Sequence, residues 1–225
     1  MRFTEPLRTG LWLALILLLS ACATGPGKEL AESESELPAE RSPALPAGPV
    51  TANPYLARQS TVSRSAQARF EQALAAIDAA DWPRAERLLL ELSESNPELS
   101  GPQLNLGLVR RAQGDAARAE QAFRRALEIN GNNLDAWNQL AILKRAAGDF
   151  SEAERLYRQA LAVWPFHPES HRHIGILYDL YLGEWQRALE HYQAYQQLLP
   201  EPDRQVNGWI VDLERRIAAA GQGGE

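Results

Sequence analysis

Cysteine and lysine are almost absent from this 225-residue chain. Cysteine occurs once, at Cys22, and lysine occurs twice, at Lys28 and Lys144. A single cysteine excludes an internal disulfide and any metal site built from several thiolates. The net charge is −6, and no basic patch dominates the sequence. Nucleic acid is therefore not expected as a partner.

The sequence motifs of common enzymes are also lacking. There is no glycine-rich phosphate loop, no nucleophile elbow and no serine–histidine–aspartate pattern of a hydrolase. The four histidines, His167, His171, His173 and His191, lie close together, but no cysteine or carboxylate completes a ligand set beside them. His167 precedes Pro168 and is expected to cap a helix instead. We therefore predict a protein that is not an enzyme and has no metal and no cofactor.

The N-terminus has the layout of a secretory signal. Arg2 and Arg8 supply positive charge, and residues 11–19 form an unbroken apolar run. That run is shorter than the ~20 residues needed to cross a bilayer. Its length is typical of the apolar region of a signal peptide. Residues 1–21 are therefore predicted to be a signal peptide.

The residues that follow resemble the lipobox of bacterial lipoproteins, in which an apolar residue and two small residues precede a cysteine. Here they are Leu19, Ser20, Ala21 and Cys22. The resemblance implies cleavage before Cys22, acylation of its thiol with palmitate-type chains, and a stable membrane anchor. Ala23 rather than aspartate follows, and by resemblance to the lipoprotein sorting rules of enteric bacteria this implies the periplasmic face of the outer membrane of a Gram-negative bacterium, with the inner membrane as the alternative. An uncleaved anchor with an incidental cysteine is the other interpretation.

A linker is predicted to follow the anchor, over residues 22–63. It is rich in proline, glutamate and alanine and has few large apolar residues. Such a composition buries too little surface to offset the entropy of ordering, so disorder is expected. Tyr55 and Leu56 are either ordinary linker residues or a short docking motif.

From residue 66 the sequence repeats with a period of 34. The repeat is clearest in a column of alanines, Ala85, Ala119, Ala153 and Ala188, the last displaced by one residue. A large residue follows each alanine by four positions: Leu89, Phe123, Tyr157 and Tyr192. Gly114-Asp115 and Gly148-Asp149 mark turns between two helices within a unit.

This pattern resembles the tetratricopeptide repeat (TPR) family, which has the signature Trp-x2-Leu-Gly-x2-Tyr, Ala-x3-Phe and Pro at period 34. The third unit carries it almost complete, with Trp137, Leu140, Ala141, Ala153, Tyr157, Ala160 and Pro165. The resemblance implies an all-α solenoid of helical hairpins over residues 64–219, in which each hairpin is stabilised by its neighbours. The units are expected at about 66–99, 100–133, 134–167 and 168–202, with a capping helix at 203–219 and a disordered tail at 220–225.

The fourth unit departs from the pattern, because residues 179–185 contain one extra residue between its two helices. The unit is also rich in aromatic residues: Tyr178, Tyr181, Trp185, Tyr192 and Tyr195. Two interpretations are open. The aromatic side chains either pack the core beside a lengthened turn or form an exposed binding patch.

TPR solenoids present a concave groove lined by the first helix of each hairpin. The repeat columns predict a partner-binding set of Asn105, Leu108, Arg111, Asn138, Ile142, Arg145, Arg172 and His173. Its aliphatic and basic character favours an acidic or carboxylate-bearing peptide. The alternative is a solvated helix surface whose arginines pair with glutamates of the same repeat.

The combined resemblances imply a membrane-anchored periplasmic TPR scaffold or adaptor for proteins of the cell envelope. Lipoproteins of this kind serve in pilus assembly, in outer-membrane protein assembly, or as adaptors for peptidoglycan hydrolases. A self-associating structural lipoprotein that uses the aromatic fourth repeat is the alternative, so an oligomer is possible.

Overall fold

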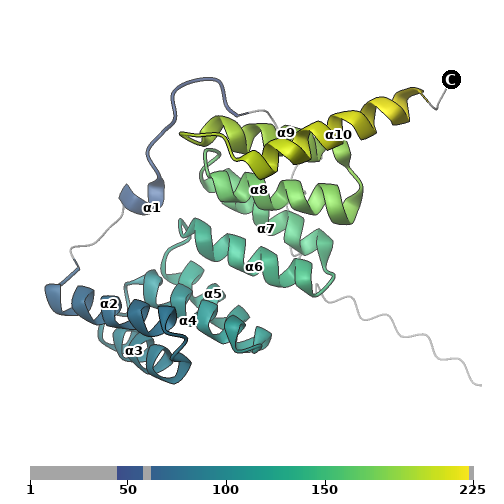
Figure 1. Ribbon diagram of the computed structural model, residues 1–225. Helices are drawn as coiled ribbons and strands as arrows, with labels where there is room; N and C mark the ends of the chain where they lie inside the picture. The colour runs from purple at the N-terminus through teal and green to yellow at the C-terminus, as the bar shows by residue number, and fades with distance from the viewer. Residues whose placement is uncertain (1–44, 58–61, 223–225) are drawn as a thin grey trace, which may run out of the picture. The chain divides into compact units, whose positions relative to one another are not determined.

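The computed structural model describes residues 45–57 and 62–222, and all regular structure in them is helical (Figure 1). The helices are α1 (Pro54–Ala57), α2 (Arg64–Asp78), α3 (Trp82–Ser95), α4 (Ser100–Ala112), α5 (Ala116–Ile129), α6 (Leu134–Ala146), α7 (Phe150–Val163), α8 (Pro168–Leu177), the π-helical turn η1 (Tyr178–Leu182), α9 (Trp185–Leu198) and α10 (Arg204–Gln222). The predicted all-α class is confirmed.

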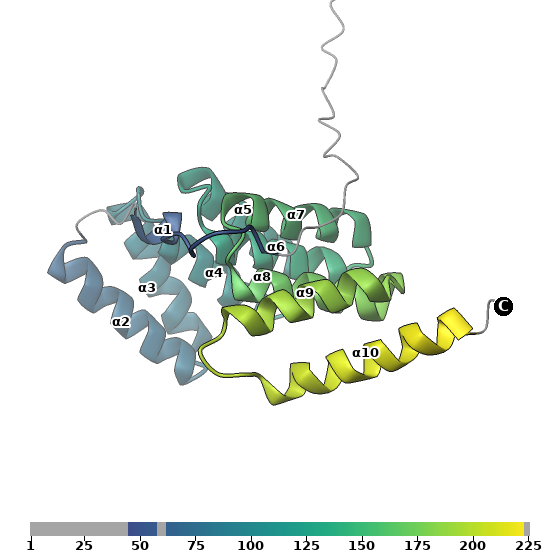
Figure 2. The same ribbon diagram turned by 90° about the horizontal axis from the view of Figure 1, so that it is seen from above.

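Helices α2 to α9 form four hairpins in chain order. The two helices of each hairpin pack together, and each hairpin packs on the next. Helix α10 packs against α9, alongside which it lies in Figure 2. The predicted solenoid of four repeats and a C-terminal helix is therefore confirmed.

The C-terminal helix is longer than expected. Asp203 caps it through its carboxylate, which accepts hydrogen bonds from the backbone N–H groups of Gln205 and Val206. It continues to Gln222, so residues 220–222 are helical although a disordered tail was predicted to begin at residue 220. The three alanines at 218–220 explain the difference, because alanine has the highest helix propensity.

The turns inside the hairpins share one backbone feature, a residue with positive φ. Gly114, Gly148 and Gly183 occupy the left-handed region, with φ of +82°, +82° and +68°. In the second and third hairpins an aspartate follows the glycine and caps the next helix. The first hairpin has Ala80 in the glycine position, and its φ is +53°. A side chain is therefore held there in a conformation that favours glycine.

The core lies between the helices of the hairpins. The column of alanines, Ala85, Ala119, Ala153 and Ala188, is fully buried. The rings of Phe123 and Tyr192 pack directly against Gly107 and Gly175 of the facing helices. Small residues are thus placed where helices approach closely, as the repeat pattern predicted.

The extra residue of the fourth repeat is absorbed in η1, which continues α8 with a wider helical turn. Gly183 ends this turn, and the N–H of Glu184 donates to the carbonyl oxygen of Tyr178 at 2.9 Å. Single π-helical turns of this kind are frequent at functional sites.

The described part of the predicted linker makes two hydrogen bonds that involve its side chains or backbone. The indole N–H of Trp164 donates to the carbonyl oxygen of Thr51 at 3.1 Å, and Asn53 caps α1 by accepting from the N–H of Tyr55. Pro54 suits the first position of a helix, which helps to explain this local order. The segment predicted to be disordered thus contains a short helix at residues 54–57 and a hydrogen bond to the third hairpin. The predicted signal peptide, Cys22 and residues 23–44 lie outside the described residues.

Candidate functional site

The first helices of successive hairpins lie next to one another, because α4 contacts α6 and α6 contacts α8. Their shared surface carries Leu108, Ile142 and Ile176, all half-buried, together with Arg111, Arg145, Arg172 and His173. We call this surface the first-helix face. It holds most of the residues that the repeat columns predicted for partner binding.

Three arginines cross this face, one from each of the last three hairpins. The guanidinium of Arg111 donates to the side-chain oxygen of Gln139 on the next hairpin. Arg145 lies over the ring of Tyr181 at 5.6 Å, and Arg172 lies over Trp209 of α10 at 5.9 Å. Cation–π contacts of this length orient a guanidinium without neutralising its charge.

Two further side chains lie beside these arginines. The ring of Tyr157, from α7, stacks on the imidazole of His173 with 6.1 Å between ring centroids. Burial raises the pKa of Tyr157 to about 12. Burial, followed by the charges of Arg145 and Arg172, lowers the pKa of His173 to about 4. Both groups are therefore neutral at pH 7.

Two of the predicted partner-binding residues have internal roles. Asn138 is only 2% exposed, and its side-chain oxygen accepts from the hydroxyl of Ser170 at 3.0 Å. It joins α6 to α8 inside the stack, so its placement on the binding surface is corrected: it faces the neighbouring hairpin. Asn105 is half-buried and donates to the carbonyl oxygen of Gly101, one turn earlier in its own helix.

The aromatic side chains of the fourth hairpin are mostly internal. Tyr178, Tyr192 and Tyr195 are buried. The hydroxyl of Tyr178 donates to Glu154 at 2.8 Å. Tyr181 is 46% exposed, and its neighbour Leu180 is 68% exposed. The exposed surface therefore comes from the π-helical turn, and the three buried tyrosines fill the core.

A buried histidine pair lies within the fourth hairpin. The two Nδ1 atoms of His171 and His191 are 2.9 Å apart, and Nε2 of His171 is 2.9 Å from the carbonyl oxygen of Pro165. A carbonyl only accepts, so neutral His171 carries its proton on Nε2 and His191 donates from Nδ1. No set of three potential metal-ligating side chains occurs among the described residues.

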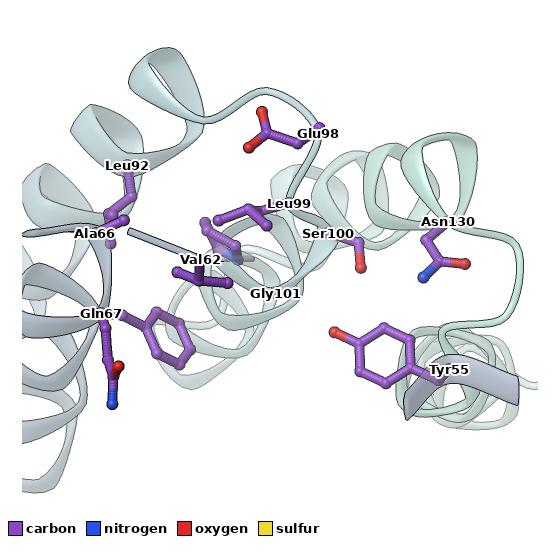
Figure 3. Close-up of a pocket in the computed structure, with 12 residues that line it drawn as sticks. Tyr55, Val62, Ala66, Gln67, Leu92, Glu98, Leu99, Ser100, Gly101 and Asn130 are labelled. Carbon is purple, nitrogen blue, oxygen red and sulfur yellow. The ribbon is translucent and has the colours of Figure 1, made fainter. Parts of the chain in front are cut away.

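A cavity of about 540 Å³ lies between α1, the first hairpin and the start of the second (Figure 3). Apolar side chains of Tyr55, Val62, Phe70 and Leu99 line much of it. The hydroxyl of Tyr55 lies 3.9 Å from the point where a Cβ on Gly101 would stand. This contact connects the N-terminal segment to the second hairpin.

Two overlapping stretches, residues 98–164 and 132–201, match the tetratricopeptide repeat family. Residues 98–201 are tetratricopeptide repeats. The first hairpin precedes these stretches but has the same two-helix form. Repeats of this family support a role in protein–protein interaction. None of the curated proteins matches the sequence.

Solved structures of MamA have a similar TPR fold. The protein "MamA 41-end from Desulfovibrio magneticus RS-1" is 17% identical, covering 69% of this chain and 87% of its own, with a TM-score of 0.56. A MamA RS-1 ArsTM double mutant is 18% identical, covering 68% and 85%, with a TM-score of 0.55. Another MamA crystal structure is 16% identical, covering 59% and 77%, with a TM-score of 0.52. At these identities the likeness shows the fold alone.

Tyr157 and Trp209 contact the first-helix face, although they were predicted only as parts of the repeat signature and of the capping helix. Tyr181 belonged to the aromatic set of the fourth repeat, for which core packing and an exposed binding patch were both left open. The contacts of these three residues with His173, Arg145 and Arg172 arise between elements, which a repeat alignment does not reveal. No helix in residues 45–57 or 62–222 has the length and apolar content needed to cross a bilayer.

Proposed function

We propose that this chain is a lipid-anchored adaptor on the periplasmic face of the outer membrane, and that its repeats bind other proteins of the cell envelope. The observation that carries the proposal is the sequence Leu19-Ser20-Ala21-Cys22 after an apolar run, placed upstream of a TPR domain. The anchor fixes the domain to a membrane surface, and the repeats supply a surface for partners. The role is one of binding rather than catalysis.

The first-helix face supports the binding part of this proposal. It combines half-buried aliphatic side chains with three arginines, of which only Arg172 has a described carboxylate within 4 Å, that of Glu169 at 3.9 Å. A surface of this kind favours partners that present apolar and acidic side chains together. Assembly of a pilus or of a peptidoglycan-enzyme complex would use such an adaptor.

Membrane fractionation of cells expressing the native chain or Cys22→Ser tests the anchor. We expect the native chain in the outer-membrane fraction and the variant in the soluble periplasmic fraction or still carrying its signal peptide. Metabolic labelling with a fatty-acid analogue should mark only the native chain. An unlabelled native chain, or a variant that stays in the outer membrane after signal cleavage, would contradict the proposal.

Crosslinking in intact cells tests the adaptor role. We expect the native chain to capture a defined envelope protein, and a variant with Arg111, Arg145 and Arg172 changed to alanine to lose it. The matched control changes Arg87, Arg125 and Arg155 to alanine, which removes the same charge from the second helices of the hairpins. Equal capture by both variants would mean that the partner binds a surface other than the first-helix face.

A further inference from the structure

Arg145 differs from the other half-buried arginines of the described chain. Arg110 is paired with Glu86 at 3.2 Å, and Arg187 is paired with Glu154 at 2.7 Å. Arg145 is half-buried as well, yet no described carboxylate lies within 4 Å of it. Its neighbour Arg172 has only Glu169, at 3.9 Å. A guanidinium withdrawn from water without an anion is costly, so this pair of cations needs a further explanation.

The same place holds four buried polar atoms that make no hydrogen bond with any described residue. They are Nη1 of Arg145, Nε of Arg172, the hydroxyl of Tyr157 and Nδ1 of His173. The two arginine nitrogens can only donate, and the tyrosine hydroxyl donates readily. Buried polar groups in folded proteins are nearly always paired, so four together indicate a place built to receive an acceptor.

The local charge also favours a negatively charged acceptor. Burial is the main cause that lowers the pKa of His173, and the charges of Arg145, Arg172 and, more weakly, Arg111 add to it. Two carboxylates lie nearby: Asp179 is held by Arg216 at 3.0 Å, and Glu169 lies 3.9 Å from Arg172 and 3.8 Å from Nε2 of His173. Glu169 offsets part of the positive charge, and Arg145 has no described carboxylate within 4 Å. A site walled by protein in which one sign of charge is in excess concentrates ligands of the opposite sign.

We infer that Arg145, Arg172, Tyr157 and His173 form a subsite for an aspartate or glutamate side chain on an extended acidic segment of a partner protein. This inference rests on the proposed adaptor function and names the chemistry of its ligand. Arg145 and Arg172 exchange their contacts with Tyr181 and Trp209 for hydrogen bonds to the incoming carboxylate. That movement uncovers the hydroxyl of Tyr157 and Nδ1 of His173 beneath them.

Two features of the first-helix face favour a side-chain carboxylate inside an extended peptide over the carboxylate at a chain terminus. The arginines are spread over three successive hairpins, which is more cationic surface than a single chain terminus needs. Leu108, Ile142 and Ile176 run beside them and suit apolar side chains between the acidic ones. Nucleic acid lacks such apolar side chains, and the chain as a whole is negatively charged.

The test uses the full chain in mild detergent and a fluorescent eight-residue peptide of alternating glutamate and leucine with an amidated C-terminus. Two further peptides replace each glutamate by glutamine, one amidated and one with a free carboxylate. We expect fluorescence anisotropy to report binding of the glutamate peptide, at least tenfold weaker binding of both glutamine peptides, and weaker binding at higher salt. Equal binding of the glutamate peptide and the amidated glutamine peptide would overturn the inference. Tight binding of only the free-carboxylate glutamine peptide would make the subsite a terminus receptor, which also overturns it.

Variants locate the site. We expect Arg145→Gln/Arg172→Gln to weaken binding of the glutamate peptide at least tenfold. Arg87→Gln/Arg125→Gln, with the same change of net charge on exposed second-helix arginines, should stay within threefold of the native chain. Tyr157→Phe removes only a hydroxyl that has no partner, so it should leave the melting temperature unchanged or higher while weakening binding several-fold. Unchanged binding in Arg145→Gln/Arg172→Gln would refute the site.

The outcome separates this inference from the proposed function. If an envelope protein is captured in cells but the glutamate peptide fails to bind, the adaptor role stands and the subsite is refuted. If the peptide binds through Arg145 and Arg172 but the chain is neither lipidated nor crosslinked to an envelope protein, the subsite stands and the envelope assignment fails.

Discussion

Gly175 and Tyr192 meet with no room for a side chain between them. A Cβ placed on Gly175 would lie 2.6 Å from Cε1 of the Tyr192 ring, which is far inside van der Waals contact. Gly107 has the same relationship with Phe123 in the second hairpin. In the third hairpin Ala141 stands in the glycine position, and both it and Tyr157 are fully buried. The pair of residues at the contact between the two helices, a small residue facing a ring, therefore differs from one repeat to the next.

Gly175→Ala should destabilise the domain. Alanine improves helix propensity by about 1 kcal/mol over glycine. Overpacking of a close core contact costs about 1–3 kcal/mol, which exceeds that gain. We expect a lower melting temperature, by a few degrees, in thermal unfolding followed by circular dichroism.

Gly208→Ala is the matched control, because Gly208 lies in α10 with nothing within 4 Å of the added Cβ. Only the helix-propensity gain applies there, so this variant should melt at a higher temperature than the native chain. If both substitutions raised the melting temperature, the close approach of Gly175 and Tyr192 would be refuted.

Ala80→Gly should stabilise the domain, although most replacements of alanine by glycine do the opposite. The left-handed conformation costs an L-residue roughly 1–2 kcal/mol, and glycine avoids this cost. Glycine also loses more entropy on folding, so the net gain should be about 0.5–1 kcal/mol. Denaturant unfolding measures it as a higher midpoint with an unchanged slope.

Ala79→Gly tests the specificity of that effect. Ala79 has φ of −81°, which is ordinary for alanine, so glycine there should only destabilise. Destabilisation of similar size in both variants would mean that Ala80 is not strained.

The buried histidines should make the domain sensitive to mild acid. Burial, then the adjacent His171, lowers the pKa of His191 to about 3, and burial also lowers the pKa of His171. Unfolded histidine has a pKa of about 6.5, so below that pH the unfolded chain binds protons that the folded chain does not. Stability should therefore be full above about pH 7 and fall progressively as pH is lowered through 6 to 5, with His191 alone contributing a loss of roughly 2 kcal/mol at pH 5 and His171 adding to it.

Urea unfolding at pH 7.5, 6.5, 5.5 and 5.0 measures this loss. For His191→Phe the free energy of unfolding should fall less steeply over the same range, because the variant has one histidine fewer that binds a proton only when the chain unfolds. A native chain that is equally stable at pH 7.5 and 5.0 would contradict the neutral buried pair.

The sequence was sufficient to predict the parts of the fold that recur. The alanine column and the aspartates after Gly114 and Gly148 follow from a 34-residue period, because each repeat solves the same packing problem. The π-helical turn was visible only as an extra residue near 179–185. An inserted residue can lengthen a loop or widen a helix, and the choice depends on how Tyr178 packs against Arg187 and Glu154.

The site was predictable only in outline. Repeat columns indicated which positions share the first-helix face, but they assign a helical face and not the depth of a side chain. Asn138 and Arg172 occupy equivalent positions in successive repeats, yet Asn138 is buried because Ser170 on the next hairpin offers it a hydrogen bond. The contacts of Arg172 with Trp209 and of Arg145 with Tyr181 join non-equivalent elements, so no column could contain them.

The contact between Thr51 and Trp164 determines where a pulling force on the N-terminal side enters the domain. The chain reaches Trp164 in the third hairpin and Tyr55 beside the second before it enters α2. Tension transmitted from upstream of Thr51 would therefore load the middle of the stack first. The Thr51–Trp164 hydrogen bond would break first, and the chain between Thr51 and α2 would then extend before any force acted on the first hairpin.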